Sequence, residues 1–334
     1  MPVVTVRQLV KEYRVHRKPE GLLASVRALF RRRYQRIRAV DGISFDIEEG
    51  EMVGFLGPNG AGKTTTLKVL SGLIYPTSGT AEVLGFVPWQ RRNAYRRRFA
   101  LLMGQKNQLW WDLPAMESFH LHKEIYAIPK RRFREVLDEL STLLEVRDLL
   151  HQPVRELSLG ERMKMELIAA LLHSPRVLFL DEPTIGLDVV AQMSIRQCLK
   201  AYNREKRITV LLTSHYMQDI EALCDRVLII HHGRLIHDGP LARVLDRFGG
   251  YKLLKVRFGN GHVPERLDSI GEVVELDPPT VTFHLPRDEV PERASRLLQR
   301  FAVEDISVED PPIAEVIGRV FRDADDRPSG ERVP

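Results

Sequence analysis

Residues 57–65, Gly-Pro-Asn-Gly-Ala-Gly-Lys-Thr-Thr, constrain the fold more than any other stretch of this chain. They fit the pattern G-x-x-x-x-G-K-[ST], with a strand-like run over 51–56 before them and a helix-like run over 65–71 after them. Glycines let the backbone turn so tightly that successive N–H groups face one anion. The following helix directs the positive end of its dipole at the same point. The motif therefore predicts a nucleotide-binding phosphate loop.

The loop residues have distinct expected roles. The backbone holds phosphate oxygens, Lys63 reaches the β- and γ-phosphates, and the Thr64 hydroxyl is a ligand for Mg²⁺. The residues expected to bind the nucleotide are Gly57, Pro58, Asn59, Gly60, Ala61, Gly62, Lys63, Thr64 and Thr65.

An apolar strand that ends in two acids supplies a second part of a phosphate site. Residues 177–180 are apolar, and Asp181 and Glu182 follow them. A strand buried on both faces cannot hold carboxylates in its middle, but at its carboxyl end they face the ligand crevice. Asp181 is then placed to hold Mg²⁺, directly or through water, and Glu182 to accept a proton from the attacking water. Taken alone, such a pair is more often a solvated turn.

The pattern of strands and helices predicts an α/β fold. Apolar strands over 177–181, 208–213 and 227–231 alternate with helix-like stretches, which indicates a parallel sheet covered on both faces. Residues 2–14 alternate like an edge strand. A mostly helical pattern predicts a helical subdomain, inserted over about 98–175.

A length of 334 residues, 43% of them hydrophobic, suits two domains. The Gly pair at 249–250 predicts a boundary between a nucleotide-binding domain over 1–247 and a small α+β domain over 251–322. The polar tail 323–334 is expected to be flexible.

Arginine is concentrated in two stretches, 31–38 and 91–98, although the net charge is only +5. Residues 21–38, within an insertion over about 16–38, have the spacing of a basic amphipathic helix. Such a helix is compatible with a membrane surface, with a docked partner, or with packing onto the protein itself. The arginine clusters are compatible with nucleic acid, anionic lipid, an acidic partner or a solvated helix face.

Cysteine usage and hydropathy point to a cytosolic protein. Cys198 and Cys224 form no metal-type cluster and are typical of buried thiols in a reducing compartment. The apolar runs are too short to cross a bilayer, and the first residues do not resemble a signal peptide.

These motifs occur with others that jointly resemble the ATP-binding cassette (ABC) ATPases. Leu157-Ser-Leu-Gly-Glu161 resembles the family's signature motif and lies between the two parts of the phosphate site. The resemblance covers residues 3 to about 245. It implies a P-loop NTPase cassette, in which a RecA-like mixed sheet carries an inserted helical subdomain. Residues 183–188 and the small C-terminal domain are most similar to bacterial ATPase subunits of ABC-2-type exporters.

The resemblance also implies a Q-loop. Gln105 is followed in the sequence by apolar and acidic residues at the family's spacing. It therefore matches the family's glutamine that is a catalytic residue and a Mg²⁺ ligand. Gln108 is the competing candidate. Trp110 and Trp111 follow, where the family meets its membrane subunit, and core packing of one of them is equally plausible.

Three further residues take roles from the resemblance. His215, after Thr-Ser, matches the switch histidine that senses the γ-phosphate, and Asp188 matches the D-loop. Tyr13 matches the aromatic that stacks on adenine, although a tyrosine that packs on the sheet is a fair competitor.

The signature segment Ser158, Leu159, Gly160 and Glu161 also reads as a helix capping box. The two interpretations are compatible, because a helix start offers N–H groups to an anion. The resemblance implies that this anion is the γ-phosphate of ATP on a second copy, so the chain acts as a head-to-tail homodimer. Leu159 and Glu161 depart from the usual Leu-Ser-Gly-Gly-Gln, and Glu161 brings a negative charge near ATP.

We therefore expect an ATPase subunit, at the cytoplasmic face of the membrane, that powers a separate ABC-2-type permease. ATP and Mg²⁺ are the implied cofactors, the permease and a second copy are the implied partners, and no nucleic acid is expected. Residues 21–38 are a candidate membrane contact. The alternatives are a soluble ABC ATPase that acts on nucleic acid or ribosomes, and a slow-turnover nucleotide-dependent regulator.

Overall fold

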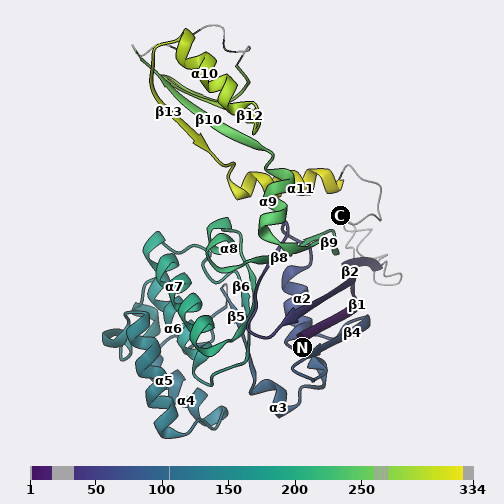
Figure 1. The fold of residues 1–334 in the computed structure, drawn as a ribbon. Coiled ribbons are helices and arrows are strands. Elements are labelled where there is room, and N and C mark those ends of the chain that lie inside the picture. Colours follow the sequence, from purple (N-terminus) through teal and green to yellow (C-terminus); the bar gives the residue numbers. More distant parts are fainter. Residues whose placement is uncertain are drawn as a thin grey trace, which may run out of the picture. The chain divides into compact units, whose positions relative to one another are not determined.

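The computed structural model describes residues 2–16, 34–104, 106–259, 263–264, 267 and 270–325. The chain divides into two compact units, the first ending at Gly239 and the second starting at Pro240. Each unit is described by itself, with the element labels of Figure 1.

The first unit is built on a six-stranded sheet, in the order β5-β6-β7-β3-β8-β9 (Figure 1). The four pairs from β5 to β8 are parallel. All five residues of β6 and of β7 are buried, as expected for apolar strands covered on both faces. The parallel sheet is confirmed. Its strands are β3 (Met52–Leu56), β5 (Phe99–Met103), β6 (Val177–Asp181), β7 (Thr209–Thr213), β8 (Arg226–His231) and β9 (Arg234–Pro240).

A second, antiparallel sheet has the order β2-β1-β4. The strands are β1 (Pro2–His16), β2 (Tyr34–Glu48) and β4 (Ser78–Val83). The prediction of an edge strand over 2–14 is wrong, because β1 lies between the other two. Alternating side chains show which face of a strand is buried, but not which strands pair with its edges.

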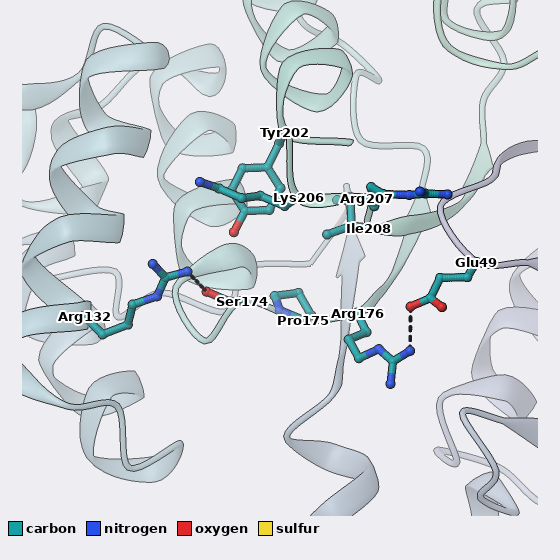
Figure 2. A pocket seen from close by; sticks show the side chains of 9 residues that line it. All are labelled: Glu49, Arg132, Ser174, Pro175, Arg176, Tyr202, Lys206, Arg207 and Ile208. Atoms are coloured by element: carbon teal, nitrogen blue, oxygen red, sulfur yellow. Dashed lines mark hydrogen bonds and ion pairs between the residues drawn. The ribbon is translucent and has the colours of Figure 1, made fainter. Parts of the chain in front are cut away.

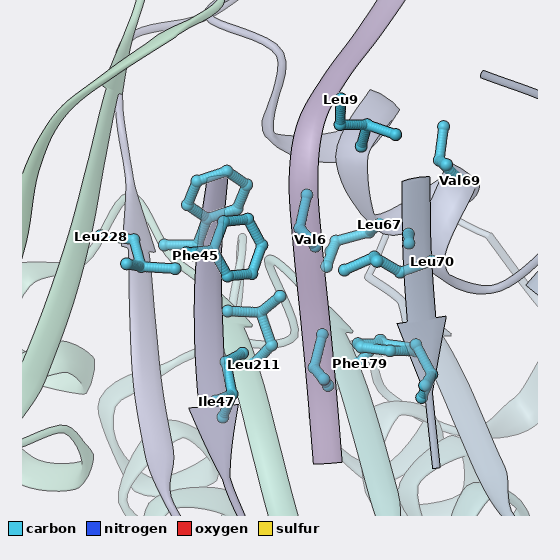
Figure 3. Close-up of a cluster of buried hydrophobic side chains, with 14 of the residues drawn as sticks. Val6, Leu9, Phe45, Ile47, Leu67, Val69, Leu70, Phe179, Leu211 and Leu228 are labelled. Atoms are coloured by element: carbon cyan, nitrogen blue, oxygen red, sulfur yellow. The ribbon is translucent and has the colours of Figure 1, made fainter. Parts of the chain in front are cut away.

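The hydrophobic core of the first unit joins the two sheets and helix α2 (Lys63–Leu70). Val6 and Phe45 come from the antiparallel sheet, Phe179 and Leu211 from the parallel one, and Leu67 from α2 (Figure 3). This shared core fixes the start of α2 against the carboxyl ends of the parallel strands.

The region between β4 and β6 is helical except for β5. Its elements are the 3₁₀ turns Pro88–Gln90, Arg147–Leu149 and Val154–Glu156 and the helices α3 (Asn93–Arg96), α4 (Ala115–Ile125), α5 (Lys130–Leu143) and α6 (Leu159–Leu171). Residues 99–103, predicted as helical, instead form the edge strand β5 beside β6. Five residues are too few for a period to be read from the sequence, and pairing with β6 decides the conformation.

The predicted basic helix over 21–38 lies mostly outside the described residues, which resume at residue 34. Its last part, 34–38, is wrong as a helix, because these residues belong to β2 and pair with β1 as far as His16. Backbone pairing with β1 outweighs the helical spacing of the apolar side chains.

Two helices follow the parallel strands, α7 (Val189–Lys206) after β6 and α8 (Met217–Leu223) after β7. Asp188 caps α7 by accepting a hydrogen bond from the Ala191 N–H at 2.9 Å.

The second unit is a four-stranded antiparallel sheet, in the order β11-β12-β10-β13, with its own core beneath α10. Helix α11 extends to Asp325, so residues 323–325 are helical and not a flexible tail; residues 326–334 lie outside the described part. The elements are α9 (Leu241–Phe248), β10 (Tyr251–Phe258), β11 (Glu272–Asp277), β12 (Thr280–Pro286), α10 (Val290–Arg300), β13 (Val303–Glu309) and α11 (Ile313–Asp325).

Phe179→Ala should destabilise the first unit by about 3–5 kcal/mol, because the ring is fully buried between the two sheets. Urea unfolding followed by fluorescence measures this change. Ile125→Ala, at a side chain that is 57% exposed on α4, serves as the control and should cost less than about 0.5 kcal/mol. Equal losses in the two variants would contradict the described core.

Candidate nucleotide site

The phosphate loop joins the end of β3 to the start of α2. Gly60 and Gly62 have φ angles of 80° and 109°, in the left-handed region that favours glycine. A side chain at Gly57 or Gly62 would place Cβ 2.3 Å from the backbone oxygen of Ile230 or Ala39. No side chain caps α2, so its first N–H groups remain available to an anion.

Lys63 lies over this loop. Its Nζ donates hydrogen bonds to the carbonyl oxygens of Gly57 (2.5 Å) and Pro58 (3.1 Å), and the residue is 6% exposed. Burial lowers the pKa of Lys63, while Glu182 and Asp181 act in the opposite direction. The ammonium group is therefore held at the mouth of the loop, where a phosphate would meet it.

Three oxygen-bearing side chains meet at the carboxyl ends of β6 and β7. The hydroxyls of Thr64 and Thr213 each donate to the buried Asp181 carboxylate at 2.8 Å. Hydroxyl and carboxylate oxygens are the ligands that Mg²⁺ prefers. Thr64 and Asp181, both named from the sequence, thus lie close enough to share one cation.

Glu182 directly follows Asp181 in a left-handed conformation, with φ at 55°. Its N–H donates to the carbonyl oxygen of Thr213 at 3.0 Å, and its Oε1 lies 2.7 Å from Nε2 of His215. Strained backbone of this kind persists where the surroundings determine it, often at functional sites. The two residues expected to act on the attacking water and the γ-phosphate are therefore in direct contact.

Gln105 lies outside the described residues. Gly104, just before it, donates its N–H to the carbonyl oxygen of Asp181 at 2.9 Å. A Cβ at Gly104 would lie 2.1 Å from the carbonyl oxygen of Glu182. The segment predicted to be the Q-loop is therefore preceded by a residue that lies beside the two acids.

Tyr13 lies in β1 opposite Ile37 of β2 and is 36% exposed. Two residues further along β2, the carbonyl of Ala39 approaches Gly62 of the phosphate loop. The ring contacts Lys11, whose Nζ lies 5.2 Å from its centroid. Tyr13 is thus an exposed aromatic on the strand pair that borders the phosphate loop.

The capping box predicted at the signature segment is confirmed. The Ser158 N–H and hydroxyl both donate to Glu161 Oε2 at 2.8 Å, and the Glu161 N–H donates to the Ser158 hydroxyl at 3.3 Å. A Cβ at Gly160 would lie 2.7 Å from that of Ala191, in the first turn of α7. The signature segment and the Asp188 cap are thus neighbours, whereas α6 and α2 lie in different parts of the unit (Figure 1).

A buried network around Asp219 of α8 was not predicted from the sequence. Its carboxylate accepts hydrogen bonds from the hydroxyls of Ser214 and Thr184 and from Arg196 Nε, the last at 2.6 Å. Asp219 is 1% exposed. It therefore connects the loop after Glu182, helix α7 and the residue before His215. Only its position four residues after His215 marks it in the sequence.

A second missed residue, Glu166 of α6, joins the signature helix to the segment after Gln105. Its Oε1 accepts the backbone N–H groups of Gln108 (2.8 Å) and Leu109 (3.2 Å). Burial raises the pKa of Glu166, and these hydrogen bonds oppose the shift. In the same segment, Trp111 lies under the Arg162 guanidinium, 5.3 Å from the ring centroid.

This segment borders a groove of about 360 Å³ between β5 and the helical region. The residues that line it include Leu73, Arg96, Gln108, His122, Tyr126 and His173. Trp110 and Trp111, just beyond it, are nearly half exposed, so neither is a core residue of this unit.

Another hollow, of about 570 Å³, lies at the amino ends of β6 and β7 (Figure 2). Arg176, which precedes β6, pairs with Glu49 at 2.6 Å, and Arg132 of α5 donates to the Ser174 hydroxyl. Asp181 and Thr213 stand at the opposite ends of these strands, so this hollow is separate from the phosphate loop.

The phosphate loop, the paired acids and the histidine at the next strand end define a P-loop nucleoside triphosphatase. The family model described as ABC transporter matches residues 40–185, and that of the EvrA-like ABC transporter, C-terminal domain, matches 250–309. The ATP-binding protein NatA of Bacillus subtilis (strain 168) is 34% identical over 210 residues, which cover 63% of this chain and 85% of NatA. This chain belongs to the ABC transporter family as an ATP-binding subunit, and it is an ATPase.

Other known proteins agree with this assignment. The bacitracin transport ATP-binding protein BcrA of Bacillus licheniformis is 34% identical over 64% of this chain and 69% of its own. A solved ATP-binding subunit of an ABC transporter superposes with a TM-score of 0.61 at 26% identity, over 74% of this chain and 93% of its own. The dimeric cassette MJ0796 bound to ADP and Pi superposes with a TM-score of 0.59 at 23% identity, over 71% of this chain and 98% of its own. This similarity supports the fold. The predicted cassette is thus confirmed.

Asp219→Asn should lower the kcat of ATP hydrolysis roughly ten- to hundredfold with a much smaller change in KM, because Ser214 positions the neighbouring His215. Steady-state kinetics of the purified chain measures both constants. Glu221→Gln, on the exposed side of the same helix, is the matched control. Unchanged kcat in Asp219→Asn would show that the network does not position the histidine.

The side chain of His173, which lines the groove, makes the free energy of unfolding depend on pH. Burial lowers its pKa to about 4, against about 6.5 when unfolded. The unfolded chain therefore takes up a proton first as the pH falls, and stability is lost between about pH 6.5 and pH 4. Relative to His173→Phe, the chain should lose about 2 kcal/mol of unfolding free energy between pH 7.5 and pH 5, measured by urea titration. Parallel losses in both proteins would refute this role of His173.

Proposed function

We propose that this chain powers a separate membrane permease of an ABC-2-type exporter, with ATP held between two copies arranged head to tail. Similar proteins are named for bacitracin transport and for linearmycin resistance, which supports export. No helix in the described part of the chain is long and apolar enough to cross a bilayer. A permease partner would then hold the chain at the cytoplasmic face of the membrane.

The observation that supports the dimer is that the predicted ATP-site residues lie in two separate places on one chain. The phosphate loop, Asp181 and Glu182 lie together, while Ser158 and Gly160 lie beside the start of α7. An uncapped helix start and an exposed signature turn are complementary halves if two copies face each other. In that arrangement Ser158 and Gly160 of one copy contact the γ-phosphate bound by the other, and Leu159, Glu161 and Asp188 line the junction.

The surface around these residues suits such a junction. Leu159 is 39% exposed, and Val189, Val190 and Met193 at the start of α7 are 50–75% exposed. Exposed apolar side chains clustered beside polar ones are typical of protein interfaces.

Within one half, each residue has a role set by its contacts. The loop from Gly57 to Thr65 binds the phosphates, Lys63 neutralises their charge, and Tyr13 stacks on adenine. Glu182 accepts the proton of the attacking water, and His215, held by Glu182, contacts the γ-phosphate. Catalysis consists mainly of positioning and charge neutralisation.

Thr64, Asp181 and Gln105 are the residues that would hold Mg²⁺. The cation would neutralise charge that develops on the β- and γ-phosphates. The fit rests on the hydroxyl and carboxylate oxygens of Thr64 and Asp181, which already lie within hydrogen-bonding distance of each other.

The groove beside the Q-loop is the proposed docking site of the permease. Glu166 of α6 accepts hydrogen bonds from Gln108 and Leu109 at the edge of this groove. In this proposal the first residues of α6 contact the ATP of the partner copy. A permease segment in the groove would therefore act on the ATP junction through a single helix. Exposed Trp110 and Trp111 extend the contact surface.

One observation favours a slow-turnover regulator as the second candidate. Glu161 accepts the hydrogen bond that the Ser158 hydroxyl would otherwise donate to the γ-phosphate, so closure must break this hydrogen bond. Assembly with the permease distinguishes the two candidates, because the transporter subunit then hydrolyses ATP and the regulator does not.

Glu182→Gln should still bind ATP, lose hydrolysis by roughly a hundredfold or more, and accumulate as a closed dimer. Size-exclusion chromatography with and without ATP, beside a phosphate-release assay, measures both effects. Adding Ser158→Arg to the same variant should return it to a monomer, because the arginine blocks the junction. Hydrolysis at the wild-type rate in Glu182→Gln would rule out the assigned general base.

A further inference from the structure

Positive charge is concentrated in one part of the first unit. Residues 57–111 contain eight lysines and arginines and a single acid, Glu82, whereas the whole chain has a net charge of only +5. Five of these cations are the arginines at positions 91, 92, 96, 97 and 98, and all five are exposed.

These arginines lie beside exposed apolar side chains. The Arg91 guanidinium lies over Tyr75, 5.6 Å from the ring centroid, and its Nε donates to the carbonyl oxygen of Gly72 at 2.8 Å. Tyr75 is 56% exposed and Leu73 is 53% exposed. We call Leu73, Tyr75 and the five arginines the arginine surface.

The arginine surface is not neutralised within the described part of the chain. Arg96 donates to the Asn93 side chain, and Arg98 lies over Phe86, so their contacts are neutral. No described carboxylate pairs with any of the five, although arginines elsewhere, such as Arg226, do form ion pairs. The charge is therefore available to an external anionic partner.

We propose that the arginine surface binds the headgroups of an anionic lipid bilayer. Arginines set beside an exposed tyrosine and leucine match the charged and apolar layers of a membrane interface. A nucleic-acid or purely acidic protein partner would not require the exposed leucine. Leu73 and Arg96 also line the groove beside the Q-loop. The arginine surface is thus continuous with the groove proposed as the docking site of the permease. Only the orientation of this surface toward the membrane rests on the proposed function.

The test is sedimentation of the full chain with vesicles of phosphatidylcholine that contain about one-third phosphatidylglycerol, without a permease. The chain should bind them, bind pure phosphatidylcholine vesicles much more weakly, and lose binding as salt is raised. The double variant Arg92→Gln with Arg97→Gln should weaken binding about tenfold or more. Tyr75→Ser should weaken it at constant charge, because an interfacial side chain is lost.

The matched control is Arg131→Gln with Arg134→Gln, which removes the same charge from exposed positions on α5. It should change vesicle binding by less than about twofold. The basic residues 17–33 are present in every variant, so the difference reports on the arginine surface alone. An equal loss in both double variants, or no preference of the chain for anionic vesicles, would overturn the proposal.

Three further outcomes distinguish the lipid proposal from an acidic protein partner and from the proposed function. If the Arg92/Arg97 variant binds vesicles normally but fails to co-purify with a permease, the partner is an acidic protein segment and the lipid proposal is wrong. A chain that hydrolyses ATP with a permease but ignores anionic vesicles would overturn only the lipid proposal. Vesicle binding without any permease-dependent hydrolysis would overturn only the proposed function.

Discussion

Unpaired backbone N–H groups at the start of α2 are the feature on which the site depends, because they create an anion-binding concavity at the carboxyl edge of a buried sheet. Close approach makes the glycines necessary: at Gly57 and Gly62 any side chain would collide with a neighbouring carbonyl oxygen. The same crowding fixes the loop against β2 and β8. A rigid loop holds its N–H groups in place before the phosphate arrives, so little ordering is needed on binding.

The parallel sheet then determines what can surround that anion. Strands β6 and β7 are buried throughout, and apart from Thr209 at the amino end of β7 their polar residues stand at the carboxyl ends. Asp181 and Thr213 meet there, beside Thr64. The buried Lys63 and the acids are electrostatically complementary, and each lowers the cost of burying the other.

Hydrogen bonds to buried carboxylates connect this site to the helices around it. Asp219 joins the loops that carry Glu182 and His215 to α7, and Glu166 joins α6 to the segment after the Q-loop. A buried carboxylate that loses one partner leaves a costly uncompensated charge. Displacing one element would therefore disturb the next, which suits the proposed control of hydrolysis by a permease.

Local patterns in the sequence were sufficient for the phosphate loop, the apolar strands, the two acids that follow one of them and the Ser158–Glu161 capping box, because each depends on neighbouring residues. Tertiary structure alone decided the pairing of β1 between two strands, the strand conformation of 99–103 and of 34–38, and the partners of Asp219 and Glu166. Those features depend on residues that are distant in the sequence. The local spacing of apolar side chains does not show which distant strand or loop a given residue will contact.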